Sequence, residues 1–245
     1  MRCFLKQIGV DHLDVRLDLV KGYSETGLLK MGDLMALVDR LDNLGLKIER
    51  VVACGTSQPA EPGTRLDLQE ETDKLCQVTE MVGRAGIAVM EPASPLSLRA
   101  NIQGSALQTY HFQGMYAGLL IDAKMPGWEE RAGRGGYIHP AFDYQAAQAA
   151  SAEPPPDEAE ERVWEDLVTM YRQLIPVAES ASVLVSQHGA DPPLPSLGGR
   201  AQILYRFADF DRLFSEVPSP NNDMTFCVGT RYESGEDIFE DIRHF

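Results

Sequence analysis

The hydrophobic pattern in the first part of the chain alternates between strand-like runs and helical spacing. Residues 10–17, 46–55 and 87–94 are short apolar runs that predict strands. Residues 31–45 and 66–86 have helical spacing and each ends at a glycine, which predicts two helices. The expected apolar face of the first of these helices consists of Leu34, Leu37, Val38, Leu41 and Leu44. This strand–helix–strand–helix–strand order indicates a parallel sheet covered by helices.

The pattern becomes irregular in the middle of the chain and then resumes. Residues 95–150 mix glycines, aromatic and polar residues without a period, and we expect a functional loop or lid there. The stretch SAEPPPDEAEE, residues 151–161, is typical of an exposed linker. The elements expected after it are helix 158–180, strand 182–188, helix 203–215, strand 223–229 and helix 235–244.

The five expected strands predict an α/β fold in one domain of 245 residues. A doubly wound sheet and an incomplete (β/α)8 TIM barrel both fit this alternation. No GxGxxG or GxxxxGK[ST] phosphate loop follows any expected strand, and this absence from the sequence favours the barrel.

Charge and cysteine content exclude several classes of protein. The 37 acidic and 22 basic residues give a formal charge of −15, which repels nucleic acid and anionic membrane surfaces. No apolar run has the roughly 20 residues of a membrane span, and the N-terminus does not resemble a secretion signal, so we expect a cytoplasmic protein. The four cysteines form no CxxC pair and are expected to be reduced thiols.

Two side chains that can bind metals fall at expected strand ends. His188 ends the fourth strand within SQHGADPPLPSLGG, and Cys227 lies near the end of the fifth within TFCVGT. Active sites of parallel α/β folds lie at these ends, and imidazole with thiolate suits Mn, Fe, Co or Zn. Taken alone, each residue also fits a structural role, because a free cysteine commonly packs as a small hydrophobic residue.

The segments HGADPPLPSLGG and LFSEVPSPNNDMTFCVGTRYESGEDIFEDIRHF resemble the mannonate dehydratase family, metal-dependent lyases with a xylose-isomerase-like barrel. In that family a strand ends in His followed by PDDPP and PSLGG, and the next strand carries TFC.G after SPNNG. The spacing between His188 and Cys227 is 39 positions, which is similar to the family's spacing. Several upstream stretches match in the same order, so the resemblance covers nearly the whole chain.

The resemblance implies that His188 and Cys227 are ligands of a divalent metal, Mn²⁺ or Fe²⁺. It also implies that Asp191 belongs to a polar loop that either orients His188 or binds substrate, with an Asx turn as the alternative. Arg134, in GRGG, could bind the carboxylate of a sugar acid, or the segment could be a flexible turn. His139 could face the substrate, or it could be an exposed loop residue.

The activity implied is the dehydration of D-mannonate to 2-keto-3-deoxy-D-gluconate. A sugar isomerase or epimerase of the xylose isomerase type is an alternative, and an inactive fragment or binding subunit is another. Assays with mannonate and keto-sugars would separate the first two, and metal content would separate both from the third.

The chain departs from the family pattern in three ways. Gly189 and Ala190 stand where the family has Pro and Asp. The family takes two further ligands, a His and an Asp, from later strands, and its first strand has no match, so we expect roughly strands two to six of a barrel truncated at both ends. The two open sheet edges would be explained by a truncated gene model, which we favour, or by a partner chain, and they also allow a homo-oligomer.

Overall fold

The computed structural model describes the fold in seven segments of the chain. In a few short stretches it describes the backbone alone, and these are residues 128–132, 138–142, 157–159, 196–197 and 200. The described segments are residues 4–53, 67–92, 128–132, 138–142, 157–190, 193–197 and 200–245.

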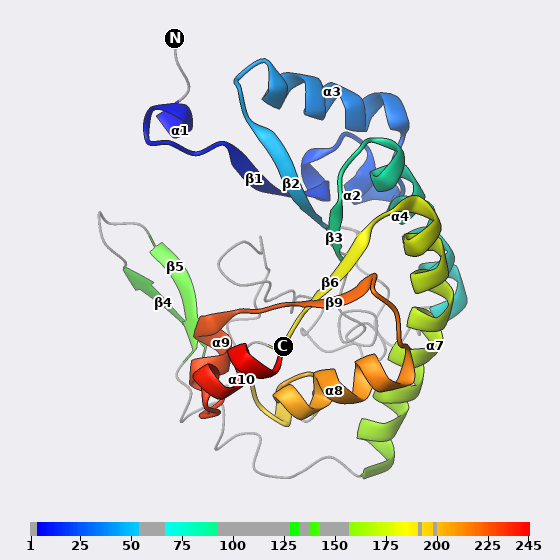
Figure 1. The fold of residues 1–245 in the computed structure, drawn as a ribbon, viewed down its shortest axis with the longest axis vertical. Helices are drawn as coiled ribbons and strands as arrows, with labels where there is room; N and C mark the ends of the chain where they lie inside the picture. The colour runs from blue at the N-terminus through cyan, green and yellow to red at the C-terminus, as the bar shows by residue number, and fades with distance from the viewer. Residues whose placement is uncertain are drawn as a thin grey trace.

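A five-stranded sheet forms the centre of the described structure, and two small hairpins accompany it (Figure 1). The sheet consists of β1 (His12–Arg16), β2 (Lys47–Val52), β3 (Val89–Glu91), β6 (Leu184–His188) and β9 (Asn222–Thr225). The hairpins are β4 (Trp128–Ala132) with β5 (Ile138–Phe142), and β7 (Ser196–Leu197) with β8 (Arg200–Ala201). The described helices are α1 (Phe4–Gln7), η1 (Leu17–Leu19), α2 (Tyr23–Thr26), α3 (Met31–Asp42), α4 (Leu68–Arg84), α7 (Asp157–Ala181), α8 (Phe207–Glu216), α9 (Val228–Glu233) and α10 (Ile238–His244).

The order of the strands distinguishes the two folds that the sequence left open. Neighbouring strands follow the chain, β1-β2-β3-β6-β9, and every pair is parallel. A doubly wound sheet reverses its order at a switch point, whereas a (β/α)8 barrel adds each new strand on the same side of the last. The described sheet has no reversal, and it is therefore an incomplete barrel.

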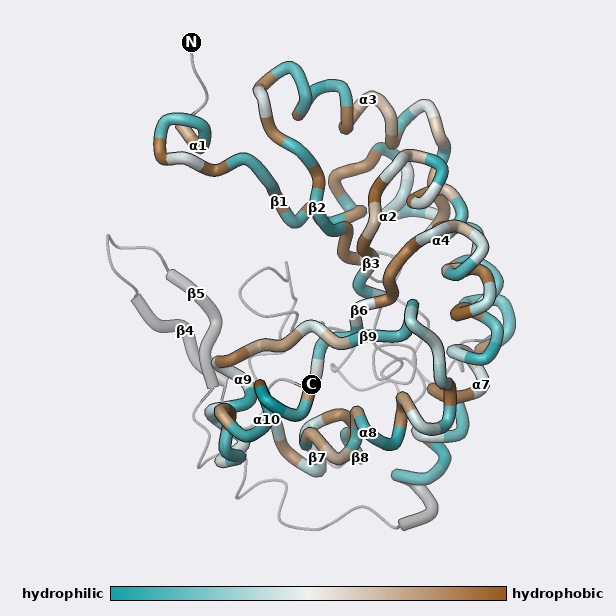
Figure 2. The backbone as a smooth tube through the Cα atoms, viewed as in Figure 1, coloured by the Kyte–Doolittle hydropathy of each residue, from teal (hydrophilic) through white to brown (hydrophobic). Residues whose placement is uncertain are grey.

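The two faces of the sheet have different partners. Val51, Met90 and Val185 are fully buried and belong to the core that includes the apolar faces of α3, α4 and α7. Figure 1 shows these three helices on one side of the sheet, and Figure 2 shows hydrophobic segments in β3 and β6 at its middle. Because side chains alternate along a strand, the neighbouring residues point to the opposite face, which would be the inside of a barrel. That inner face carries Arg50, Glu91, Ser186 and Thr225 toward the carboxyl ends of the strands.

A close contact between α4 and the end of α7 fixes the helical layer. A Cβ placed on Gly83 of α4 would lie 2.4 Å from the carbonyl oxygen of Ala181. Only glycine allows this approach, although glycine is a weak helix former. Pro176 lies inside α7, and the helix continues past it to Ala181.

Three expectations about the elements were wrong in detail. Leu44 was expected on the buried face of a helix, but α3 ends at Asp42 and the side chain of Leu44 is exposed. The stretch 95–150 was expected to be irregular, but β4 and β5 pair within it. The fifth strand was expected to reach residue 229, but β9 ends at Thr225. Among the described residues, every helix is too short or too polar to cross a lipid bilayer.

Candidate metal site

His188 and Cys227 meet at the carboxyl ends of two neighbouring strands. His188 is the last residue of β6, and its partner in the parallel ladder is Thr225, the last residue of β9. Cys227 follows Thr225 by two positions and is the N-cap residue of α9. The two side chains lie close enough for each to shift the pKa of the other. The structure therefore brings the two predicted ligands together.

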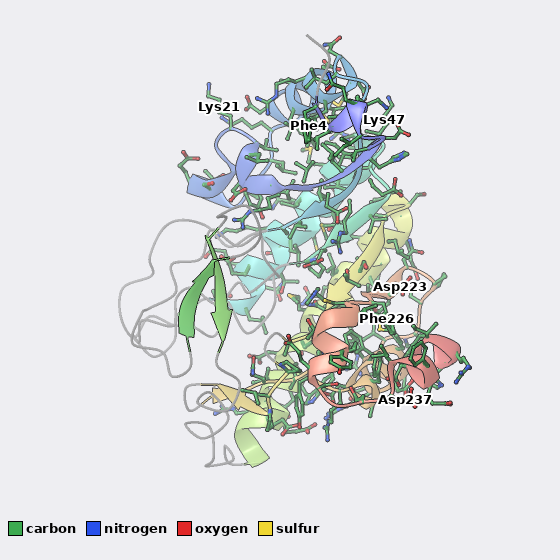
Figure 3. All side chains as sticks on the ribbon, turned by 90° about the vertical axis from the view of Figure 1, so that its left-hand side faces the viewer. Phe4, Lys21, Lys47, Asp223, Phe226 and Asp237 are labelled. Carbon is green, nitrogen blue, oxygen red and sulfur yellow. The ribbon has the colours of Figure 1, made fainter. Side chains whose placement is uncertain are left out.

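The residue between Thr225 and Cys227 helps to direct the thiol. The ring of Phe226 packs against that of Phe207 at the start of α8, with 5.4 Å between centroids. Figure 3 shows Phe226 next to the C-terminal helices, past Asp223 on β9. Anchoring Phe226 in this aromatic contact leaves Cys227 facing His188.

The orientation of the His188 ring is set by the backbone that follows it. Nδ1 lies 2.7 Å from the carbonyl oxygen of Gly189. A carbonyl can only accept a hydrogen bond, so Nδ1 carries a proton and Nε2 is left for another partner. Protein ligands of metals are commonly held in this way, with one ring nitrogen donating to a carbonyl and the other left for the ion.

The pair shifts the pKa of both groups. Burial lowers the pKa of His188, but the hydrogen bond with Cys227, the charge of Glu91 and the Gly189 carbonyl together raise it above the ordinary value. The hydrogen bond from His188 lowers the pKa of Cys227 to about 7, although burial opposes this shift. The hydroxyl of Thr230 donates to the same sulfur at 3.2 Å. The thiolate, which is the form that binds metals, is thereby favoured.

A hydrogen bond on the helix-facing side of β6 holds this strand against α7. The buried hydroxyl of Tyr171 donates to Oε1 of Gln187 at 2.7 Å. Nε2 of Gln187 in turn donates to the carbonyl oxygen of His188 at 2.8 Å. The backbone that carries the imidazole is therefore connected to the longest described helix.

A layer of polar side chains covers the inner face of the sheet next to His188. Nη1 of Arg50 donates to Oε2 of Glu91 and to Oγ1 of Thr225, each at 2.7 Å. Nη2 of the same guanidinium donates to Oδ2 of Asp14 at 2.6 Å. The hydroxyls of Thr225 and Ser186 lie 2.9 Å apart. This inner-face layer joins all five strands of the sheet.

Sequence reasoning missed the inner-face layer. Glu91 ends the apolar run of β3, and the register places it level with Ser186, two residues before His188. Side chains alternate between the two faces of a strand, so the sequence shows that Glu91 points to the same face as His188 on the next strand. A polar residue on that face at the carboxyl end of a parallel strand is a candidate for the site. Arg50 gives a weaker signal, because a long side chain can reach any of several partners.

The loop after His188 explains one departure from the family pattern. A Cβ on Gly189 would lie 2.5 Å from Nη2 of Arg231 and 2.9 Å from the carbonyl oxygen of Leu204. The backbone of this loop is fixed by a 2.9 Å hydrogen bond from the Ala190 amide to the same carbonyl. A proline at position 189 would not fit beside Arg231.

The other residues with predicted roles are not tested by the structure. Asp191 and Arg134 lie outside the described residues. His139 lies in β5, opposite Arg131 of β4, and only its backbone is described. In the described part of the chain, no group of three or more His, Cys, Asp or Glu side chains is arranged to hold a metal ion. His188 and Cys227 thus form a pair, and not a complete ligand set, among the described residues.

Comparison with known proteins identifies relatives of this chain. The family model described as D-mannonate dehydratase (UxuA) matches residues 115–245, which include both His188 and Cys227. The mannonate dehydratase of Thermotoga petrophila is 37% identical over 87 residues, covering 35% of this chain and 24% of the relative. Mannonate dehydratase 2 of Halalkalibacterium halodurans is 34% identical over 88 residues, covering 36% and 25%. The matched parts thus span about a quarter of the length of these curated relatives.

Solved structures agree on the fold. The mannonate dehydratase of Streptococcus suis superimposes with a TM-score of 0.57 at 18% identity, over 86% of this chain and 55% of the other. The probable 3-DHS dehydratase AsbF of Bacillus anthracis superimposes with a TM-score of 0.52 at 10% identity, over 98% and 61%. The family model covers more than half of the 245 residues, so the chain belongs to the mannonate dehydratase family.

Proposed function

We propose that His188 and Cys227 hold a divalent cation, Mn²⁺ or Fe²⁺, that serves the dehydration of D-mannonate. The observation that carries this proposal is the meeting of an imidazole and a thiol at adjacent strand ends in a chain of this family. The curated relatives that match are named mannonate dehydratases, and this supports the choice of substrate and reaction.

The chemistry of the two side chains fits such an ion. Nε2 of His188 is free to bind an ion because Nδ1 donates to the Gly189 carbonyl. A pKa of about 7 provides the Cys227 thiolate near neutral pH. A nitrogen and a sulfur donor suit borderline divalent ions. Bound there, the ion would act as a Lewis acid toward substrate oxygens.

The dehydration removes one water from the sugar acid. The C2–H bond breaks and its proton passes to a base, while its electron pair forms the C2=C3 double bond. The C3–O bond breaks with its electron pair, and the departing hydroxide takes up one proton and leaves as water, so that H and OH are lost together. The resulting enol rearranges to the 2-keto-3-deoxy acid. Arg134 is proposed to bind the substrate carboxylate, and Asp191 and His139 are proposed to bind its hydroxyls.

The test uses the purified chain with two cysteine variants. Cys227→Ser removes the proposed sulfur ligand, and Cys76→Ser is the matched control because Cys76 is also a half-buried free cysteine, on α4. We expect Mn²⁺ binding in the parent chain and in Cys76→Ser and its loss in Cys227→Ser, and any metal-dependent formation of the 2-keto-3-deoxy acid should be lost in Cys227→Ser as well.

The alternatives give different results in the same experiment. Metal binding with isomerisation of keto-sugars, and no dehydration of mannonate, would favour an isomerase. A parent chain that binds no divalent metal would overturn the proposal and favour an inactive fragment or binding subunit.

A further inference from the structure

Glu91 is the most deeply buried carboxylate in the inner-face layer. Its side chain is 3% exposed, and its contacts are a guanidinium and a hydroxyl, at 2.7 Å from Nη1 of Arg50 and 3.3 Å from Oγ1 of Thr225. Burial of a carboxylate is costly unless its charge is balanced. Glu91 therefore needs a compensating positive charge nearby.

Arg50 does not supply that charge in full, because it also pairs with Asp14. Nη2 of Arg50 lies 2.6 Å from Oδ2 of Asp14, and Nε donates to the same oxygen at 3.1 Å. Two carboxylates thus share one guanidinium, and this cluster carries one surplus negative charge. Burial raises the pKa of Glu91 although the charges of His188 and Arg50 oppose this shift, so the negative charge is not fully compensated.

The surplus charge lies close to the His188–Cys227 pair. Glu91 and His188 each shift the pKa of the other through their charges. Thr225 touches Glu91 with its hydroxyl and lies opposite His188 in the ladder. Glu91 is thus within electrostatic reach of His188 and contacts its strand neighbour Thr225. The described residues contain no group of three metal-binding side chains that would include it.

We propose that Glu91 is a positioning residue that stabilises a cation bound by His188 and Cys227, through the negative charge of a carboxylate that Arg50 holds beside them. This inference rests on the proposed metal site. Charged groups around a metal ion strengthen its binding without touching it, and their removal commonly costs about 10- to 100-fold in affinity.

The experiment measures Co²⁺ binding to the full chain by the thiolate-to-cobalt absorption band. Glu91→Gln keeps the size of the side chain and an oxygen that accepts from Arg50 and Thr225, but it removes the charge. Asp14→Asn is the matched control, because it removes a charge from the other side of the same guanidinium, where the carboxylate is 48% exposed. Thermal unfolding without metal is recorded for all three chains.

We expect Glu91→Gln to weaken Co²⁺ binding about 10- to 100-fold, with the same absorption spectrum at saturation and an unchanged or higher unfolding midpoint. Asp14→Asn should change the affinity less than about threefold, because charges in contact with water are screened. A merely structural role would instead lower the unfolding midpoint of Glu91→Gln.

Three outcomes would overturn the inference. Equal affinity of the parent chain and Glu91→Gln would refute the role of Glu91 and leave the metal site intact. An unfolded or strongly destabilised Glu91→Gln would show that the carboxylate serves the fold. Absence of Co²⁺ binding by the parent chain would refute the proposed function and this inference together.

Discussion

Arg231 fills the space that a side chain at position 189 would need. Its Nη2 lies 2.5 Å from the place where a Cβ on Gly189 would be, and its guanidinium stacks over Phe207 at 5.4 Å from the ring centroid. This chain has glycine where the family pattern has proline, and the buried Arg231 of α9 occupies the space that the proline ring would need. Gly189 and Arg231 therefore pack against each other in the loop that follows His188.

This packing predicts the effect of Gly189→Ala. The new methyl group would collide with Arg231 and with the backbone carbonyl of Leu204, so we expect the free energy of unfolding to fall by about 1–3 kcal/mol. In an Arg231→Leu background the same change should cost less, because one of the two collisions is removed. Chemical denaturation of the four chains checks this, and additive effects would contradict the coupling.

The hydroxyl of Tyr171 predicts a second stability effect. Tyr171→Phe leaves Oε1 of the buried Gln187 without its 2.7 Å donor, and we expect a loss of about 1–3 kcal/mol in the free energy of unfolding. Tyr232→Phe is the control, since Tyr232 is 73% exposed on α9. Equal unfolding midpoints in denaturant for the two variants would show that the Tyr171 bond contributes nothing.

The contact between α4 and α7 predicts opposite results for two helical glycines. Gly83→Ala should destabilise the chain by about 1–3 kcal/mol, because the methyl group would meet the backbone of Ala181 at 2.4 Å. Gly32→Ala on α3 meets open space and should stabilise by up to about 1 kcal/mol through helix propensity. Thermal melts followed by circular dichroism measure both, and a stabilising Gly83→Ala would contradict the close approach.

The pairing of Cys227 with His188 predicts the pH dependence of thiol alkylation in the metal-free chain. The thiolate is the reactive form, and the pKa of Cys227 is lowered to about 7, whereas burial raises the pKa of Cys76. Iodoacetamide labelling, followed peptide by peptide with mass spectrometry, should reach half its maximal rate near pH 7 at Cys227. In His188→Ala the midpoint should move up toward the ordinary thiol value of about 8.5. Parallel titration of both cysteines in the parent chain would contradict the pairing.

Much of the fold was predictable because the helices and strands have regular spacing. The buried faces of α3, α4 and α7 follow the helical period, and the five predicted strands are the five of the sheet. Periodicity alone did not separate a doubly wound sheet from a barrel; the absence of phosphate loops and the family resemblance favoured the barrel, and the strand order confirms it. The end of β9 was missed because residues 226–229 are as apolar as a strand, whereas the contact between Phe226 and Phe207 is tertiary.

The candidate site was predictable in part for a different reason. His188 and Cys227 were found by residue type and by their place at strand ends, and the structure places them close enough for each to shift the pKa of the other. Their role as metal ligands stays a prediction. Glu91 could have been predicted, because the alternation of side chains along the strands places it on the same face as Ser186 and His188. The contacts of Arg50 could not, because they depend on the conformation of its long side chain. The roles of Asp191, Arg134 and His139 stay predictions.

The central claim is that one nitrogen and one sulfur from this pair bind the same cation. X-ray absorption spectroscopy of the chain loaded with Zn²⁺ tests it most directly, because the shells of sulfur and nitrogen are resolved by distance. The account predicts one sulfur at about 2.3 Å together with nitrogen at about 2.0–2.1 Å, and loss of the sulfur shell in Cys227→Ser but not in Cys76→Ser. A zinc ion surrounded by oxygen and nitrogen alone in the parent chain would contradict it.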